Sequence, residues 1–217
     1  MKRTPEQWRQ ILCRLGVQLS TAQRWADVFA DEIKENTFSK GDVELLDFLP
    51  TILHESKMLE RMEESLNYKA EALVPTFSAH RITPAQAQQY GRIDGKQAAN
   101  QRAIANIVYG GAWGRENLGN ILPEDGWTYR GRSPGQITGR ANYARVGDLI
   151  GQNLVGIPDL LSQPRFALDA FIAWWEDRIP DSMLGETTAI RKRVNGGIIG
   201  LAEVQALTTK ARAALEA

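Results

Sequence analysis

Cysteine and histidine are scarce in this sequence. Its 217 residues contain one cysteine, Cys13, and two histidines, His54 and His80. A lone cysteine cannot form an internal disulfide, which excludes a small scaffold held together by bridges. The same residues could supply the three or four ligands of a zinc site only as a strained mixture, so we expect no metal. Neither a P-loop nor a Gly-x-Gly-x-x-Gly motif after a strand occurs, and we expect no cofactor.

The sequence also lacks an excess of charge of either sign. Its 26 Lys and Arg residues match 26 Asp and Glu residues. Binding to a phosphate backbone relies on a positive field, which this chain does not have. We therefore expect no nucleic-acid partner.

Long apolar runs are absent as well. No stretch reaches the roughly 18 consecutive apolar residues of a transmembrane helix. The first residues, Met1–Trp8, continue with polar residues where a secretory signal needs an apolar stretch. The C-terminal segment has mixed charge and no basic face. We expect no export by a signal peptide, no stable membrane association and folding in the cytosol.

Helical periodicity dominates what is present. Thr4-Pro5-Glu6-Gln7 and Thr83-Pro84-Ala85-Gln86 are capping boxes with proline at the first helical position. Pro50 lies inside a third apolar stripe, where we expect a kink or a restart. Strong period-two runs of β-branched residues are nearly absent, so the fold class is mainly α. We expect helices over residues 5–15, about 20–33, 45–55, a short one from 84, 97–108, 166–178, 187–194 and 201–215.

A glycine-rich stretch interrupts this pattern from Tyr109 to Gly139. It predicts loops with one short hairpin. Long loops inside a compact helical protein are usually functional or disordered. The interleaved Trp113, Trp127 and Tyr129 favour an ordered, functional segment.

Four glutamates are concentrated between His54 and Tyr68. Hydrolysis of a glycosidic bond needs one carboxylic acid and one carboxylate. On one continuous helix, Glu55 and Glu64 would be separated by about 900° of rotation and about 13.5 Å of rise, on opposite faces. They can share a site only if the helix ends soon after Glu55 and the chain folds back. A solvated, charged face is the alternative interpretation.

Four blocks of sequence occur in a recognisable order: Phe48–Ser56, Glu63–Tyr68, Gly126–Tyr143 and Asn195–Gly197. Together they resemble the chitinase-like lysozymes of glycoside hydrolase family 19, especially those of bacteriophages and prophages, the endolysins. Three departures concern substrate fit. Lys57-Met58 stand where relatives commonly have two glycines, Ser65 replaces an asparagine, and Ser133-Pro134-Gly135 alters the loop before Gln136.

The resemblance implies a two-lobed, lysozyme-like helical fold, with the glycine-rich loops lining a cleft between the lobes. Because no wall-binding repeat is visible and the first helices are closely joined to the rest, we expect one catalytic domain over residues 1–217, with no separate wall-binding module. The activity implied is inverting hydrolysis of β-1,4 bonds in the glycan strands of peptidoglycan. Glu55 would be the general acid, protonated with the help of burial or a nearby negative charge, and Glu64 the ionised general base. Inverting enzymes hold these carboxyl groups about 6.5 to 9.5 Å apart.

Seven further residues are candidates for the site. The resemblance suggests roles for three of them, and side-chain chemistry suggests roles for the other four. Thr138 would help to hold the catalytic water, and Gln136 and Asn195 would bind sugar groups; Thr138 and Asn195 could instead cap turns. The rings of Tyr68, Trp127 and Tyr129 could stack on sugars or belong to the core. Arg130 could steer the carboxylates of wall peptides or pair with local acids, and His54 is expected to be a packed residue.

Two rival functions remain at this stage. One is a chitinase acting on N-acetylglucosamine polymers, and the other is a wall-binding or inhibitory module that has lost catalysis. As an endolysin, the chain would act as a monomer. It would wait in the host bacterial cytoplasm until a holin-type pore, made by another protein, gave it access to the cell wall.

Overall fold

The computed structural model describes residues 2–216. Within this range the chain forms twelve α-helices and two short 3₁₀ helices, while β structure is confined to four isolated bridges. The predicted mainly α fold class is confirmed. No helix between residues 2 and 216 has both the length and the apolar character required to span a bilayer.

The helices divide into two compact units. Unit 1 comprises Met1–Met62, Ser133–Gly135 and Leu160–Ala217, and unit 2 comprises Glu63–Arg132 and Gln136–Asp159. The chain therefore passes from one unit to the other four times. The expectation that residues 1–217 act as one catalytic domain stays a prediction.

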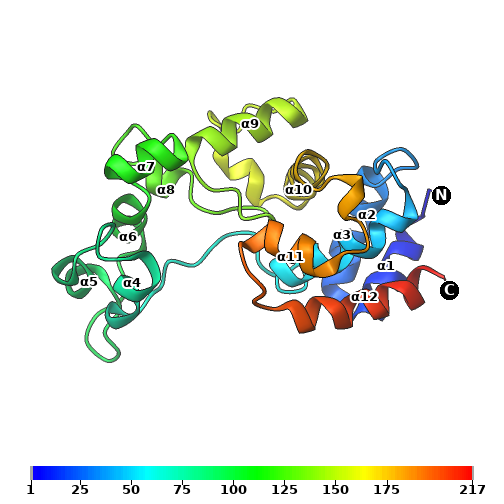
Figure 1. Ribbon diagram of the computed structural model, residues 1–217, viewed down its shortest axis with the longest axis horizontal. Helices are drawn as coiled ribbons and strands as arrows, with labels where there is room; N and C mark the ends of the chain where they lie inside the picture. Colours follow the sequence, from blue (N-terminus) through cyan, green and yellow to red (C-terminus); the bar gives the residue numbers. More distant parts are fainter. Residues whose placement is uncertain (1, 217) are drawn as a thin grey trace. The chain divides into compact units, whose positions relative to one another are not determined.

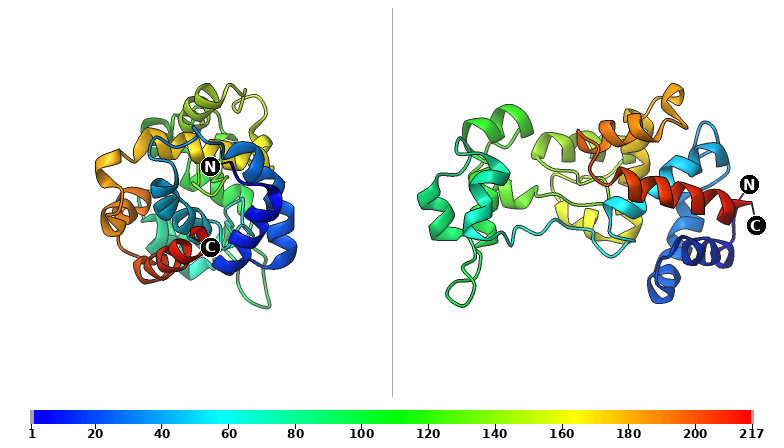
Figure 2. Two further views of the ribbon diagram at one scale, coloured as in Figure 1. Left: turned by 90° about the vertical axis from the view of Figure 1, so that its right-hand side faces the viewer. Right: turned by 60° about the horizontal axis from the view of Figure 1, so that its bottom comes forward.

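Unit 1 is built around α3 (Asp42–Glu55), whose residues are buried almost without interruption. The ring of Phe48 lies 5.2 Å from that of Phe171 and 5.5 Å from that of Trp175. This central packing fixes the end of α3, where Glu55 lies. The other α-helices of unit 1 are α1 (Pro5–Leu15), α2 (Leu19–Glu32), α10 (Pro164–Arg178), α11 (Thr187–Asn195) and α12 (Leu201–Leu215) (Figures 1 and 2).

Unit 2 has a smaller core of its own. Leu66, Leu73 and Ile104 are fully buried there, and Tyr68 packs edge-on against Phe77 at 5.2 Å. The segment that carries Glu64 thus leads directly into this core. The helices of unit 2 are α4 (Ala70–Phe77), α5 (Pro84–Tyr90), α6 (Gln101–Val108), α7 (Gly111–Leu118), α8 (Asp125–Thr128) and α9 (Arg140–Ile150) (Figure 1).

Six predicted helices are confirmed with nearly the expected bounds: α1, α2, α5, α10, α11 and α12. Both capping boxes form, with Thr4 and Thr83 accepting hydrogen bonds from the backbone of Gln7 and Gln86. Gly16 ends α1 in the left-handed conformation, as a glycine at this position favours. Capping chemistry is local, which explains why these ends can be predicted.

One predicted helix start is wrong, and one expected interruption does not occur as a restart. Helix α2 begins at Leu19, one residue before its expected start, and Thr21 lies buried inside it, where its hydroxyl bonds Glu60. Helix α3 runs through Pro50 without the predicted restart, because its buried packing offsets the missing backbone hydrogen bond. Helix α6 begins at Gln101 and not at residue 97; the side chain of Gln97 donates to the carbonyl of Gly91 at 2.6 Å and closes the preceding turn.

The glycine-rich stretch is more helical than predicted. It contains α7 and α8, and the expected hairpin is reduced to one antiparallel bridge between Arg132 and Ile137. Helices α4 and α9 also lie outside the predicted set. Glycine and proline inside these segments weaken the helical signal of the sequence, whereas tertiary packing supplies it in the fold.

Candidate active site

Glu55 is the last residue of α3, and its side chain is 17% exposed. Its Oε1 atom accepts a hydrogen bond from Nη1 of Arg191, a nearly buried residue of α11. The Nε atom of Arg191 also donates to the carbonyl of Ile199 at 2.6 Å, which fixes the guanidinium. Glu55 is therefore largely buried, one of the two expected surroundings, and its charged partner is positive instead of negative.

The helix ends at Glu55 because the next residues form a tight left-handed turn. Lys57, Met58 and Leu59 have φ values of 48°, 60° and 68°. Ser56 stabilises this turn: its hydroxyl donates to the carbonyl of Ile52 at 2.6 Å and accepts from the amide of Leu59 at 2.8 Å. The early helix end that a catalytic pair requires is thus present.

Glu64 is held from both sides within unit 2. Its Oε2 atom accepts a hydrogen bond of 2.7 Å from the hydroxyl of Tyr109, and its Oε1 atom accepts from the amide of Gly131. The backbone amide of Glu64 donates to the carbonyl of Gly131 at 2.8 Å. Burial, together with the negative charge of Glu64, raises the pKa of Tyr109 far above its ordinary value, so its hydroxyl remains a donor.

Three predicted site residues surround Gly131. A Cβ atom at this position would lie 2.8 Å from Oε1 of Gln136, 3.1 Å from Oε1 of Glu64 and 3.1 Å from Oγ1 of Thr138. The hydroxyl of Thr138 donates to the carbonyl of Gln136 at 3.0 Å. A carboxylate, an amide and a hydroxyl therefore meet at one place, where polar groups of this kind suit a bound water.

Arg130 pairs with a local acid. Its guanidinium contacts the Glu63 carboxylate at 2.9 Å, lies 4.1 Å from the centre of the Trp127 ring and is 12% exposed. Arg132, which is 1% exposed, binds the same carboxylate at 3.0 Å. These contacts agree with the interpretation in which Arg130 pairs with a local acid. They form an ion-pair network around Glu63, the residue before Glu64.

The aromatic residues differ in their surroundings. Tyr129 is 3% exposed, and its hydroxyl donates to the carbonyl of Val155 at 3.1 Å, which favours the core interpretation over stacking on a sugar. Tyr68 and Trp127 are partly exposed at the edge of the unit 2 core. Sugar binding by these two rings stays a prediction.

Asn195 ends α11 and stabilises the turn that follows. Its amide donates to the carbonyl of Ile199 at 3.2 Å and accepts from the amide of Gly197 at 2.9 Å. These contacts agree with the interpretation in which Asn195 caps a turn, and sugar binding by Asn195 stays a prediction. His54 is packed closely against the backbone of Gly200, because a Cβ atom there would lie 2.3 Å from its Nε2 atom.

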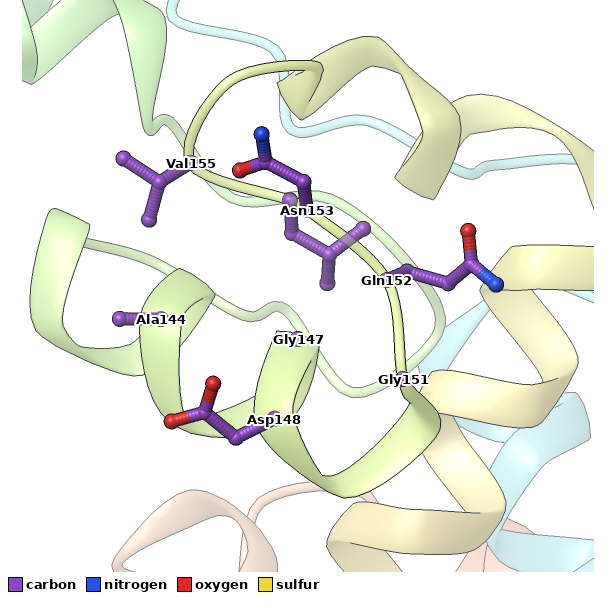
Figure 3. A pocket seen from close by; sticks show the side chains of 8 residues that line it. Ala144, Gly147, Asp148, Gly151, Gln152, Asn153 and Val155 are labelled. Carbon is purple, nitrogen blue, oxygen red and sulfur yellow. The ribbon is translucent and has the colours of Figure 1, made fainter.

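A separate hollow of about 450 Å³ lies at the C-terminal end of α9 (Figure 3). Asp148 projects from the helix, and Gln152, Asn153 and Val155 come from the loop that follows it. None of the predicted site residues lines this hollow. Elsewhere in residues 2–216, no group of three or more His, Cys, Asp or Glu side chains is placed to hold a metal ion.

Sequence reasoning missed three partners of the proposed catalytic carboxylates: Arg191, Tyr109 and Gly131. Arg191 gave no signal, because it stands in a basic helical segment, 136 positions from Glu55. Tyr109 opens the glycine-rich stretch and Gly131 lies within it, so the functional interpretation of that stretch pointed to their region. Their specific partners depend on the fold.

Comparison with known proteins identifies the family. No family model matches the chain. It is 30% identical, over 156 residues that cover 72% of both chains, to a protein of Haemophilus influenzae described as "Glycosyl hydrolase family 19 domain-containing protein". It is also 42% identical over 65 residues to Chitinase 11 of Oryza sativa subsp. japonica, which covers 30% of this chain and 25% of the rice protein. Taken with its mainly helical fold, the chain therefore belongs to glycosyl hydrolase family 19 and is a chitinase-like glycoside hydrolase.

Proposed function

We propose that this glycoside hydrolase is a lysozyme-type endolysin that cleaves β-1,4 bonds in the glycan strands of bacterial peptidoglycan. The observation that carries the chemistry is the environment of Glu64, with its two fixed donors and the neighbouring Gln136 and Thr138. The ordered sequence blocks that resemble phage and prophage enzymes support the choice of polymer.

Glu64 is the general base of this proposal. Tyr109 and Gly131 each donate to one of its oxygens, so the carboxylate is oriented before substrate binds. A water near Thr138 and Gln136 gives a proton to Glu64 while its oxygen attacks the anomeric carbon. Thr138 and Gln136 hold that water through their polar atoms.

Glu55 is the general acid. It gives a proton to the departing sugar oxygen as the glycosidic bond breaks, and single displacement inverts the anomeric configuration. In the protonated acid, one oxygen carries the proton while the other still accepts from Arg191, so the ion-pair contact becomes a positioning contact. The proton gained by Glu64 and the proton lost by Glu55 are exchanged with solvent after each turnover.

Joint action of the two glutamates is part of the proposal, because Glu55 belongs to unit 1 and Glu64 to unit 2. The carboxyl separation of about 6.5 to 9.5 Å expected of an inverting enzyme belongs to it as well. Under the same proposal the chain acts as a monomer. It waits in the host cytoplasm and reaches the wall through a pore made by another protein.

The experiment that tests this function is digestion of purified sacculi in heavy-oxygen water, followed by mass spectrometry of the products. The proposal predicts that the label enters new reducing sugar ends. Label in peptide ends contradicts it, and activity on chitin without activity on sacculi identifies a chitinase instead.

Matched variants complete this test. Glu55→Gln and Glu64→Gln should each lower turnover at least about a hundredfold, since general acid–base catalysis contributes about 10² to 10⁴. Glu71→Gln, an exposed glutamate on α4, is the control and should behave as the unmodified chain. Absence of turnover on every wall glycan by the unmodified chain would favour an inactive binding module.

A further inference from the structure

An open groove of about 610 Å³ lies on the surface of unit 1 at the C-terminal end of α3. It lies where α12 packs against both α1 and α3. His54 lines the groove, and Glu55 is the next residue of the same helix. Its volume is within the range of about 300 to 1,000 Å³ usual for small-ligand sites.

The floor of the groove is apolar. Leu15 and Leu53 are fully buried residues of α1 and α3, and Leu207 contributes from α12. Met58 lies over the end of α1, since a Cβ atom at Gly16 would be 3.6 Å from its Cε atom. The groove therefore offers contacts to methyl and methylene groups.

Charged groups stand on both walls. Lys57 comes from the turn after α3, and Lys210 and Glu203 come from α12. The lysines that form ion pairs within residues 2–216 are Lys40 and Lys69, so the ammonium groups of Lys57 and Lys210 are available to a ligand. The groove thus presents two positive charges and one negative charge around an apolar floor.

The turn that carries Lys57 and Met58 has an unfavourable backbone conformation. Both residues, and Leu59 after them, have left-handed φ values without being glycine. A left-handed conformation is unfavourable for a residue that carries a Cβ atom, because this atom approaches the following carbonyl oxygen. Strained residues of this kind persist mainly at functional sites, and the side chains of Lys57 and Met58 both line the groove.

We propose that this groove binds the peptide stem of the peptidoglycan strand whose glycosidic bond Glu55 protonates. Such a stem combines alanine methyl groups, at least two carboxylates and, in diaminopimelate-type walls, one free ammonium group. The apolar floor takes the methyl groups, Lys57 and Lys210 take the carboxylates, and Glu203 takes the ammonium. This inference rests on the proposed function and deepens it, because chitin carries no stem.

A direct binding measurement tests the groove without any hydrolysis. The probe is the synthetic tripeptide N-acetyl-L-alanyl-γ-D-glutamyl-meso-diaminopimelate, which has one free ammonium group like the stem, titrated into the full chain labelled with nitrogen-15. We expect saturable NMR shifts confined to residues 15–16, 53–58 and 203–210. No saturable shift at millimolar tripeptide, or shifts mainly in unit 2, would overturn the inference.

Variants separate the contributions of charge and shape. Lys57→Glu combined with Lys210→Glu should weaken tripeptide binding at least about tenfold, and Met58→Gly should weaken it while relieving the backbone, which protects the fold. Lys96→Glu, an exposed lysine of unit 2, is the matched control and should bind like the unmodified chain. Equal affinity for all four proteins would overturn the proposal.

Kinetics then distinguish this inference from the function on which it rests. The ratio of kcat/KM on intact sacculi to kcat/KM on glycan stripped of stems should fall about tenfold in the double lysine variant and stay constant in Lys96→Glu. Cleavage of sacculi without tripeptide binding refutes the groove alone. Tripeptide binding without cleavage of any wall glycan supports the groove and refutes the proposed function.

Discussion

Glu64 and Gly131 bind each other twice. The backbone amide of Glu64 donates to the carbonyl of Gly131 at 2.8 Å, and the amide of Gly131 donates back to the Glu64 side chain. This reciprocal pairing ties the candidate base to the glycine-rich segment at the point where Gln136 and Thr138 also approach. The orientation of the carboxylate therefore depends on a residue that has no side chain.

Gly131→Ala should lower turnover by at least about tenfold with little change in stability. The added methyl group would lie 2.8 to 3.1 Å from the polar ends of Gln136, Glu64 and Thr138, which must move apart to admit it. Those ends are flexible, so the fold tolerates the change while the catalytic geometry does not. Steady-state kinetics and the Tm check this; unchanged kcat would show that the three side chains do not act together.

Tyr109→Phe should reduce kcat about tenfold and the free energy of unfolding by about 1 kcal/mol. It removes the donor to Glu64 and leaves the ring, whose centre lies 6.1 Å from that of Phe77, in place. Activity assays and urea unfolding measure the two effects. Tyr90→Phe, which loses a hydroxyl at the end of α5, is the control; an equal loss in that variant would argue against a specific role for Tyr109.

Arg191→Ala should destabilise the protein by roughly 3 kcal/mol, because it leaves the largely buried Glu55 without its partner. Adding Glu55→Gln should recover part of this loss, since the unpaired charge is then removed. Urea unfolding of both single variants and the double variant gives the coupling energy. Additive effects would mean that the two side chains do not stabilise each other.

Stability should fall as pH rises from about 4.5 to about 7. Partial loss of solvent around its carboxyl group, and then the negative charge of Glu44, raises the pKa of Glu176 from 4.5 to about 7 in the folded protein, although the residue as a whole is exposed. A carboxyl group whose pKa is raised on folding contributes stability below its unfolded pKa and loses it as pH passes the folded value. Glu176→Gln should flatten this part of the Tm profile, and Glu116→Gln, on the exposed surface of α7, should not.

Local chemistry accounts for the parts of the fold that the sequence predicts. The capping boxes at Thr4 and Thr83 and the glycine after Leu15 act within one helical turn, so no knowledge of the fold is needed to read them. Helix α3 is different: Pro50 signals a break, and only burial on all sides explains why the helix continues.

The candidate site also has residues that the sequence predicts and residues that only the fold reveals. The family-like blocks named Glu64, Gln136 and Thr138, which the structure places around one glycine. The pairing of Arg191 with Glu55 joins residues 136 positions apart and leaves no periodic or local trace in the sequence. The resemblance pointed to a turn after Glu55, where relatives commonly have two glycines. Its left-handed geometry could not be predicted from Lys57 and Met58 themselves, because glycine is the residue that usually adopts it.

The four passages of the chain between its units have a consequence for biosynthesis. Helix α3 packs against α10 and α12, which are translated roughly 110 to 160 residues after Glu55. At about 5 to 20 residues per second, the apolar surface of α3 stays without these partners for about 5 to 30 s. We expect truncated products that lack α10 and α12 to aggregate, because this surface then remains exposed.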